Sequence, residues 1–139
     1  MTEVVDNLTE QEKQKWVSEQ FARANKHLAE NAVIFDSVAV EQSRYLVPFV
    51  AIWKINALDK KSYWVISGDL PVDYTLVDNA KDARSAMHYF SMSWQLRAEN
   101  IISLPGVDNV QADFAKLLVT KAEVLYQLYS NEQLWQHES

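Results

Sequence analysis

The chain has 139 residues, 48% of them apolar and 23% charged, which is the size and composition of one globular domain and excludes a disordered chain. It contains no cysteine, which excludes disulfides, thiol nucleophiles and cysteine-ligated metal sites. Its net charge of −6 is opposite in sign to the surface that binds phosphate backbones, so we expect no nucleic-acid partner.

The amino terminus has no basic region followed by an apolar core, as a secretory signal would. No stretch of the sequence reaches the roughly 18 apolar residues that a membrane span requires. We therefore expect a cytoplasmic protein without a membrane partner. Residues 1–8 are predicted to be a loose tail.

The first predicted helix runs from Thr9 to about Asn31. Thr9 and Glu12 have the spacing of a capping box, in which each side chain accepts from the backbone N–H of the other. Apolar residues recur at helical spacing, at Val17, Phe21, Ala24 and Leu28. The charged residues of this helix are expected to lie towards water: Glu10, Glu12, Lys13, Lys15, Glu19, Arg23 and Lys26.

Two strands are predicted next, joined by a turn at residues 58–61. Residues 33–45 come before them, and their pattern leaves the conformation open between a short strand and a helical turn at 38–43. A turn of two or four residues places Trp53 opposite Ile66 and Ile55 opposite Trp64. The expected inner face is then uniformly apolar, with both tryptophans buried on it: Phe49, Ala51, Trp53, Ile55, Trp64 and Ile66.

The loop Ser67–Asp73 is predicted to be rigid. Gly68 can adopt positive φ where the chain leaves the sheet, and proline at 71 favours an extended Leu70. Asp69 is expected to accept hydrogen bonds from nearby backbone N–H groups. A short third strand is predicted over Val72–Val77.

Two long helices complete the chain. Asp78-Asn79 is predicted to cap a helix over residues 80–102, whose apolar stripe is Ala83, Met87, Phe90, Trp94, Ala98 and Ile101. Asp108 and Gln111 form a second capping box before the last helix. Its predicted stripe is Val110, Phe114, Leu118, Leu125 and Tyr129, widened by Leu117, Val124 and Leu128. One more helical turn is expected over 130–135.

This order predicts a single α+β domain over residues 1–139: an N-terminal helix, an antiparallel β-hairpin with a short third strand, then two long C-terminal helices packed on the sheet. The second face of the hairpin is expected to carry Val50, Ile52, Tyr63 and Val65, which is too apolar for open solvent. Either neighbours of the third strand or a second copy must cover it, and we expect a homodimer.

Several segments resemble a family of small, uncharacterised bacterial proteins. They are Arg44-Tyr45-Leu46-Val47-Pro48, Trp53-Lys54, the stretch from Ala83-Arg84 to Trp94-Gln95, and above all Trp64-Val65-Ile66-Ser67-Gly68-Asp69-Leu70-Pro71-Val72-Asp73-Tyr74. The resemblance covers most of the chain. It implies no activity, because that family is a domain of unknown function.

No motif for metal, nucleotide or covalent chemistry is present, so no metal, cofactor or catalytic residue is assigned. The candidate ligand-binding residues are Asp69, Asp73, Arg44 and His88, where a carboxylate could serve as an acid or base. A structural interpretation competes with this one. In it Asp69 binds its own turn, Arg44 pairs with a carboxylate, and His88 lies on a wet helix face with Arg84, Ser91 and Gln95.

The sequence therefore favours a small, non-enzymatic binding or regulatory module that self-associates, with a further protein partner possible. The alternative is a small enzyme or ligand-binding protein that uses the acidic loop Asp69–Asp73. A pocket at that loop with several convergent polar groups would favour the alternative.

Overall fold

The computed structural model describes residues 8–138, which divide into two compact units, Met1–Ala83 and Arg84–Ser139. The predicted tail lies outside the described residues except for Leu8. That residues 1–139 act as a single domain stays a prediction.

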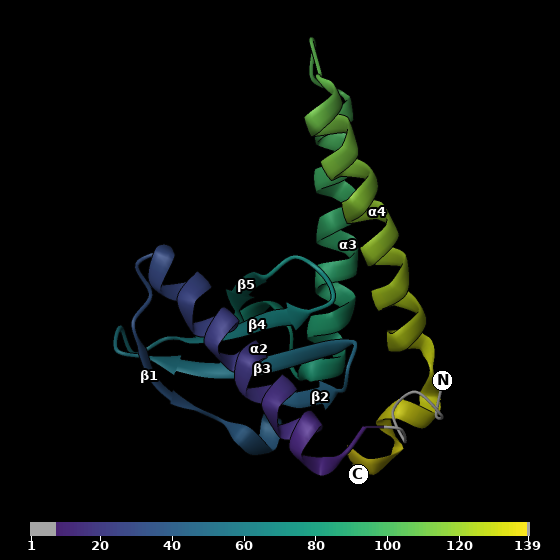
Figure 1. Cartoon of the computed structure of the whole chain (residues 1–139). Coiled ribbons are helices and arrows are strands. Elements are labelled where there is room, and N and C mark those ends of the chain that lie inside the picture. Colours follow the sequence, from purple (N-terminus) through teal and green to yellow (C-terminus); the bar gives the residue numbers. More distant parts are fainter. Residues whose placement is uncertain (1–7, 139) are drawn as a thin grey trace. The chain divides into compact units, whose positions relative to one another are not determined.

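The predicted α+β class is confirmed (Figure 1). The first unit contains helix α2 (Glu10–Glu30) and an antiparallel sheet of five strands: β1 (Phe35–Val38), β2 (Arg44–Leu46), β3 (Val50–Ala57), β4 (Ser62–Gly68) and β5 (Asp73–Leu76). Short 3-10 helices η1 (Val40–Gln42) and η2 (Val77–Asn79) connect them. The long helices of the C-terminal region are α3 (Ala83–Ile102) and α4 (Asn109–Ser130), followed by the 3-10 helix η3 (Glu132–Glu138).

Helix α2 begins with the predicted capping box. The N–H of Glu12 donates to Thr9 Oγ1 at 3.0 Å, and the N–H of Thr9 donates to Glu12 Oε1 at 2.9 Å. One face of the helix buries Ala24 and Leu28 completely. These side chains belong to a core cluster with Trp53 and Val65 of the sheet, so α2 covers one sheet face.

Strand β3 lies at the centre of the sheet. It pairs with β4 on one edge and with both β1 and β2 on the other, and β5 extends the sheet beyond β4. Residues 33–45, whose conformation could not be predicted from the sequence, thus form β1, the 3-10 helix η1 and most of β2. The strand predicted from residue 46 is interrupted, because the N–H of Phe49 donates to Leu46 O at 2.7 Å and closes a tight turn between β2 and β3.

The predicted hairpin register is wrong by one residue. Trp53 faces Val65, and Trp64 faces Lys54, so the two tryptophans lie on opposite faces of the sheet. Both are buried, at 3% and 1% exposure. The slip originates in the turn, where the N–H of Ala57 donates to Lys61 O and Lys60 adopts a φ of 70°. This leaves three residues in the loop, a common hairpin type with a left-handed third residue.

Both faces of β3 and β4 are buried, which explains why alternation did not determine the register. The shifted register also changes the second face of the hairpin, which was expected to need a second copy to cover it. The side chains of Val50, Ile52, Tyr63 and Val65 are split between the two faces, and all four are buried within the chain. The hairpin therefore no longer supports the expectation of a homodimer.

Helix α3 begins at Ala83, three residues later than predicted, because Asp78 and Asn79 form η2 instead of a cap. Its predicted stripe is confirmed for Met87, Phe90 and Trp94, which are buried. The expected extra turn at the end of the chain is observed as η3.

Helix α4 begins with the second predicted capping box, between Asp108 and Gln111. It runs antiparallel beside α3 (Figure 1). Arg84 Nε donates to Tyr129 O at 3.0 Å, and Ser91 Oγ donates to Ala122 O at 2.8 Å, so the first half of α3 is held against the second half of α4.

Candidate functional site

The acidic loop begins where β4 meets the turn between β2 and β3. Gly68 adopts a φ of +138°, and a Cβ at this position would lie 2.3 Å from Phe49 O. The next residue continues the contact, because the N–H of Asp69 donates to Phe49 O at 3.0 Å. Positive φ at Gly68 is thus confirmed, and the close approach of the β3 backbone gives it a second reason.

Arg23 of α2 holds the same loop from the other side. Its Nη1 donates to Gly68 O at 2.7 Å and to Gln20 Oε1 at 2.9 Å, and its Nη2 lies 3.4 Å from Leu70 O. Arg23 is exposed, as predicted, but its guanidinium also binds the loop, a role that the prediction did not include. No sequence signal singled out this arginine, because its partners are backbone carbonyls far along the chain. Gly68, for example, is 45 residues away.

The first residue of the loop is fixed by a buried hydroxyl. Ser67 is fully buried, and its Oγ accepts from Trp53 Nε1 at 3.3 Å and lies 3.4 Å from Gln20 O. Buried hydroxyl groups are costly unless they are hydrogen-bonded, and both bonds tie the loop to neighbouring elements. The predicted rigidity of Ser67–Asp73 thus has named contacts at its start.

Arg44 and Asp73 lie at opposite edges of the sheet. Arg44 on β2 pairs with Ile52, Ile52 pairs with Ile66, and Ile66 pairs with Asp73 on β5. Three strand spacings of about 4.8 Å separate the two backbones by about 14 Å. Asp73 Oδ1 accepts from the N–H of Tyr74 at 2.8 Å, and Asp69 is exposed. That the carboxylate of Asp69 accepts backbone N–H groups stays a prediction.

His88 belongs to the second unit, on α3. Its ring stacks on Tyr129 at a centroid distance of 4.5 Å and an interplanar angle of 12°, with Tyr126 at 6.2 Å. Ser91, one turn further along the same face, is 1% exposed. The interpretation that His88 and Ser91 share a wet face is therefore wrong, because this face of α3 contacts α4.

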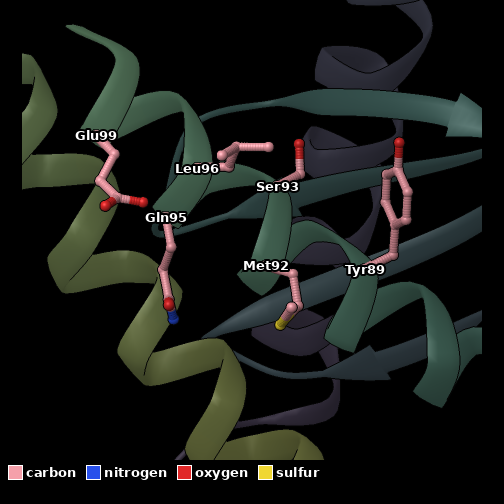
Figure 2. Close-up of a pocket in the computed structure, with 6 residues that line it drawn as sticks. All are labelled: Tyr89, Met92, Ser93, Gln95, Leu96 and Glu99. Carbon is pink, nitrogen blue, oxygen red and sulfur yellow. The ribbon is translucent and has the colours of Figure 1, made fainter. Parts of the chain in front are cut away.

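A shallow hollow of about 450 Å³ lies along α3 (Figure 2). Its lining residues are Tyr89, Met92, Ser93, Gln95, Leu96 and Glu99. None of the four candidate residues is among them. Figure 2 shows that Tyr89 and Ser93 point one way while Met92 and Gln95 point the other, so the polar ends do not converge.

The shifted pKa values belong to other residues. A hydrogen bond of 2.7 Å from Tyr63 Oη to Asp59 Oδ2, together with burial, raises the pKa of Tyr63 to about 12. The same bond, together with the N–H of Lys61, lowers the pKa of Asp59. Burial raises the pKa of Tyr45. The Asp59–Tyr63 bond spans the β3–β4 turn, which gives these shifts a structural origin.

Helix α4 carries two apolar seams. The inner seam is buried: Ala115, Leu118, Ala122 and Leu125. The outer seam is exposed: Val110, Phe114, Leu117 and Val124. The predicted stripe merged these two sets and is wrong for the outer seam. Alanines in the inner seam permit the close contact of Ser91 Oγ with Ala122 O, a packing that a search for large apolar residues overlooks.

Over residues 8–138, no three histidine, aspartate or glutamate side chains gather as a metal ion would need. In the same range, no helix combines the length and apolar character required to cross a bilayer.

Comparison with known proteins places the chain. No curated protein and no solved structure matches it. One protein family matches residues 10–135, which is nearly the whole chain. The protein belongs to this family, a domain of unknown function (DUF4826).

Proposed function

We propose that the protein is a small, non-enzymatic binding or regulatory module that self-associates through the second unit. The observation that carries the proposal is the outer seam. Phe114 is 40% exposed and Leu117 is 41% exposed, although both are large apolar residues in a helix with a complete buried seam of its own. A contiguous row of such residues on a surface is typical of a protein interface.

The acidic loop supports this function more than the alternative of a small enzyme or ligand-binding protein. Arg23 occupies two of its carbonyl groups, and Gly68 packs against the backbone of β3. Arg44 and Asp73, two of the candidate ligand-binding residues, lie on opposite edge strands with β3 and β4 between them. These contacts favour a loop that is built for structure.

Sedimentation velocity and light scattering test the proposal. We expect a dimer whose population rises with protein concentration between about 1 µM and 1 mM, the range of moderate affinities. A strict monomer throughout this range would refute self-association. The alternative is tested by thermal shifts in a screen of metabolites, because a ligand at a hundred times its dissociation constant adds about 2.7 kcal/mol to stability.

A further inference from the structure

The outer seam has the spacing of a coiled coil. With the half-buried Lys121 and Leu128 added to its four exposed residues, the row reads Val110, Phe114, Leu117, Lys121, Val124 and Leu128, with steps of four, three, four, three and four residues. This alternation is the heptad pattern that a second helix fills with side chains packed into holes. The inner seam, with the same alternation, already contacts α3. The outer seam therefore offers a place for one more helix.

We infer that this helix is α4 of a second copy, antiparallel to the first over nearly its whole length. The inference rests on the proposed self-association. Placing Val110 opposite Leu128 of the second copy overlaps all but one of the 22 residues of α4, about 32 Å of helix. Phe114 then faces Val124 of the second copy, and Leu117 faces its Lys121. Each contact between two residues of the row therefore occurs twice in the dimer, once in each direction, as a twofold axis requires.

Charge determines the orientation. Among the residues at these heptad positions, Lys121 is the one that is charged. Asp113 lies next to the row, beside Phe114. In a parallel pair, Lys121 would face Lys121 of the second copy and the two positive charges would repel each other. In the antiparallel pair, Lys121 lies about 6 Å along the axis from Asp113 of the second copy, within reach of its long side chain. A single lysine in such a row commonly specifies orientation.

The first experiment compares two aspartate substitutions on α4 in the full chain. Leu117→Asp places a charge in the outer seam, and Val119→Asp places one on the opposite side of the helix at similar exposure, 41% against 37%. We expect the dissociation constant of the dimer to rise at least about 100-fold for Leu117→Asp. It should change by less than about threefold for Val119→Asp, with the helical circular dichroism of both proteins unchanged.

The second experiment exchanges the charges. Asp113→Lys should weaken the dimer, and adding Lys121→Asp to it should restore the dimer, because the pair then attracts with opposite polarity. The two residues are eight positions apart in one helix, about 12 Å, so they do not pair within a copy. In a parallel dimer the double variant would bring like charges together and show no recovery.

Cysteine crosslinking gives an independent readout, since the chain has no cysteine of its own. Antiparallel pairing separates the two copies of residue 110 by about 27 Å along the axis, far beyond the roughly 7 Å limit of a disulfide. Val110→Cys alone should therefore not crosslink. A mixture of Val110→Cys and Leu128→Cys proteins should form the mixed disulfide.

The outcomes separate the two proposals. A wild-type protein that stays monomeric overturns self-association and, with it, the helix pairing. A dimer that survives Leu117→Asp overturns only the outer seam as its interface. A dimer that Leu117→Asp abolishes, but in which Val110→Cys crosslinks to itself, overturns the antiparallel orientation.

Discussion

The sheet of the first unit and helix α4 of the second place their large apolar side chains in opposite ways. Strands β3 and β4 bury side chains on both faces, including Trp53 and Trp64. Helix α4 buries two alanines and two leucines in its inner seam and leaves Phe114 and Leu117 exposed. All the large apolar side chains of β3 and β4 thus stabilise the first region from inside the chain, whereas α4 keeps some of its own on the surface.

This difference teaches how to interpret apolar residues in each region. In strands β3 and β4 every apolar side chain is buried within the chain, so their hydrophobicity implies no interface. In α4 the apolar positions exceed what the contact with α3 uses, and the excess follows its own heptad rhythm. The excess, rather than the total, is the indication of binding.

Truncating one aromatic residue in each region gives the largest contrast. Trp64→Ala should lower the free energy of unfolding by about 3–5 kcal/mol, because a cavity replaces a ring whose Nε1 donates to Ala80 O at 2.8 Å. Phe114→Ala should change it by less than about 0.5 kcal/mol, as surface substitutions do. Urea denaturation at a concentration where the protein is monomeric measures both. Equal costs would contradict the comparison.

The two glycines provide a second contrast. Both adopt positive φ, but a Cβ at Gly68 would meet Phe49 O at 2.3 Å, while nothing lies within 4 Å of one at Gly106. Gly68→Ala should therefore destabilise the protein by about 3 kcal/mol or more, and Gly106→Ala by about 1 kcal/mol, the cost of a left-handed alanine. If Gly68→Ala costs no more than Gly106→Ala in thermal or urea unfolding, the close packing of the loop is wrong.

Local signals predicted where α2 and α4 begin, although not where α3 does. Both capping boxes, at Thr9 and Asp108, are observed with both of their hydrogen bonds, because the partners lie three residues apart and need no tertiary contact. The stripe of α3 was also predictable, since its large apolar residues are the buried ones. These features depend on neighbours along the chain.

Features set by distant residues were not predictable. The hairpin register depends on Lys60 adopting positive φ, which a lysine rarely does, and two buried faces left no polar side to correct it. At the candidate site, the sequence identified the loop and Gly68 but not Arg23, whose role depends on where α2 lies over the sheet. Nothing in the sequence showed that Arg44 and Asp73 occupy opposite edges.

Removing one arginine side chain from each unit tests how much that side chain stabilises the segment it binds. Arg23→Ala removes bonds to Gly68 O and Leu70 O and should cost about 1–2 kcal/mol, the low end for charged donors because the side chain is partly exposed. The N–H of Asp69 should also exchange faster with deuterium, because its bond to Phe49 O lies in the released loop. Arg84→Ala, which removes bonds to Tyr129 and Glu132 instead, is the matched control. Unchanged exchange at Asp69 in the Arg23 variant would contradict the clamp.

The smallest expected effect lies at the β3–β4 turn and is a dependence on pH. The bond to Asp59 raises the pKa of Tyr63 to about 12, so the folded state favours the neutral phenol. The resulting stability is fully present below about pH 10, the pKa of an unfolded tyrosine, and is lost as the pH rises through about 12. For Asp59 the folded pKa is lowered, so its contribution is present above the ordinary carboxyl pKa and is lost as the pH falls through the lowered value.

An ultraviolet absorbance titration of tyrosinate in the wild type and in Tyr63→Phe isolates this one group by difference. We expect the difference curve to have its midpoint near pH 12. Asp59→Asn, which keeps an acceptor but removes the charge, should move that midpoint back towards about 10. A wild-type midpoint already near 10 would show that the phenol does not donate to Asp59 in solution. The turn that sets the hairpin register would then be held by its backbone bonds and the positive φ of Lys60 instead.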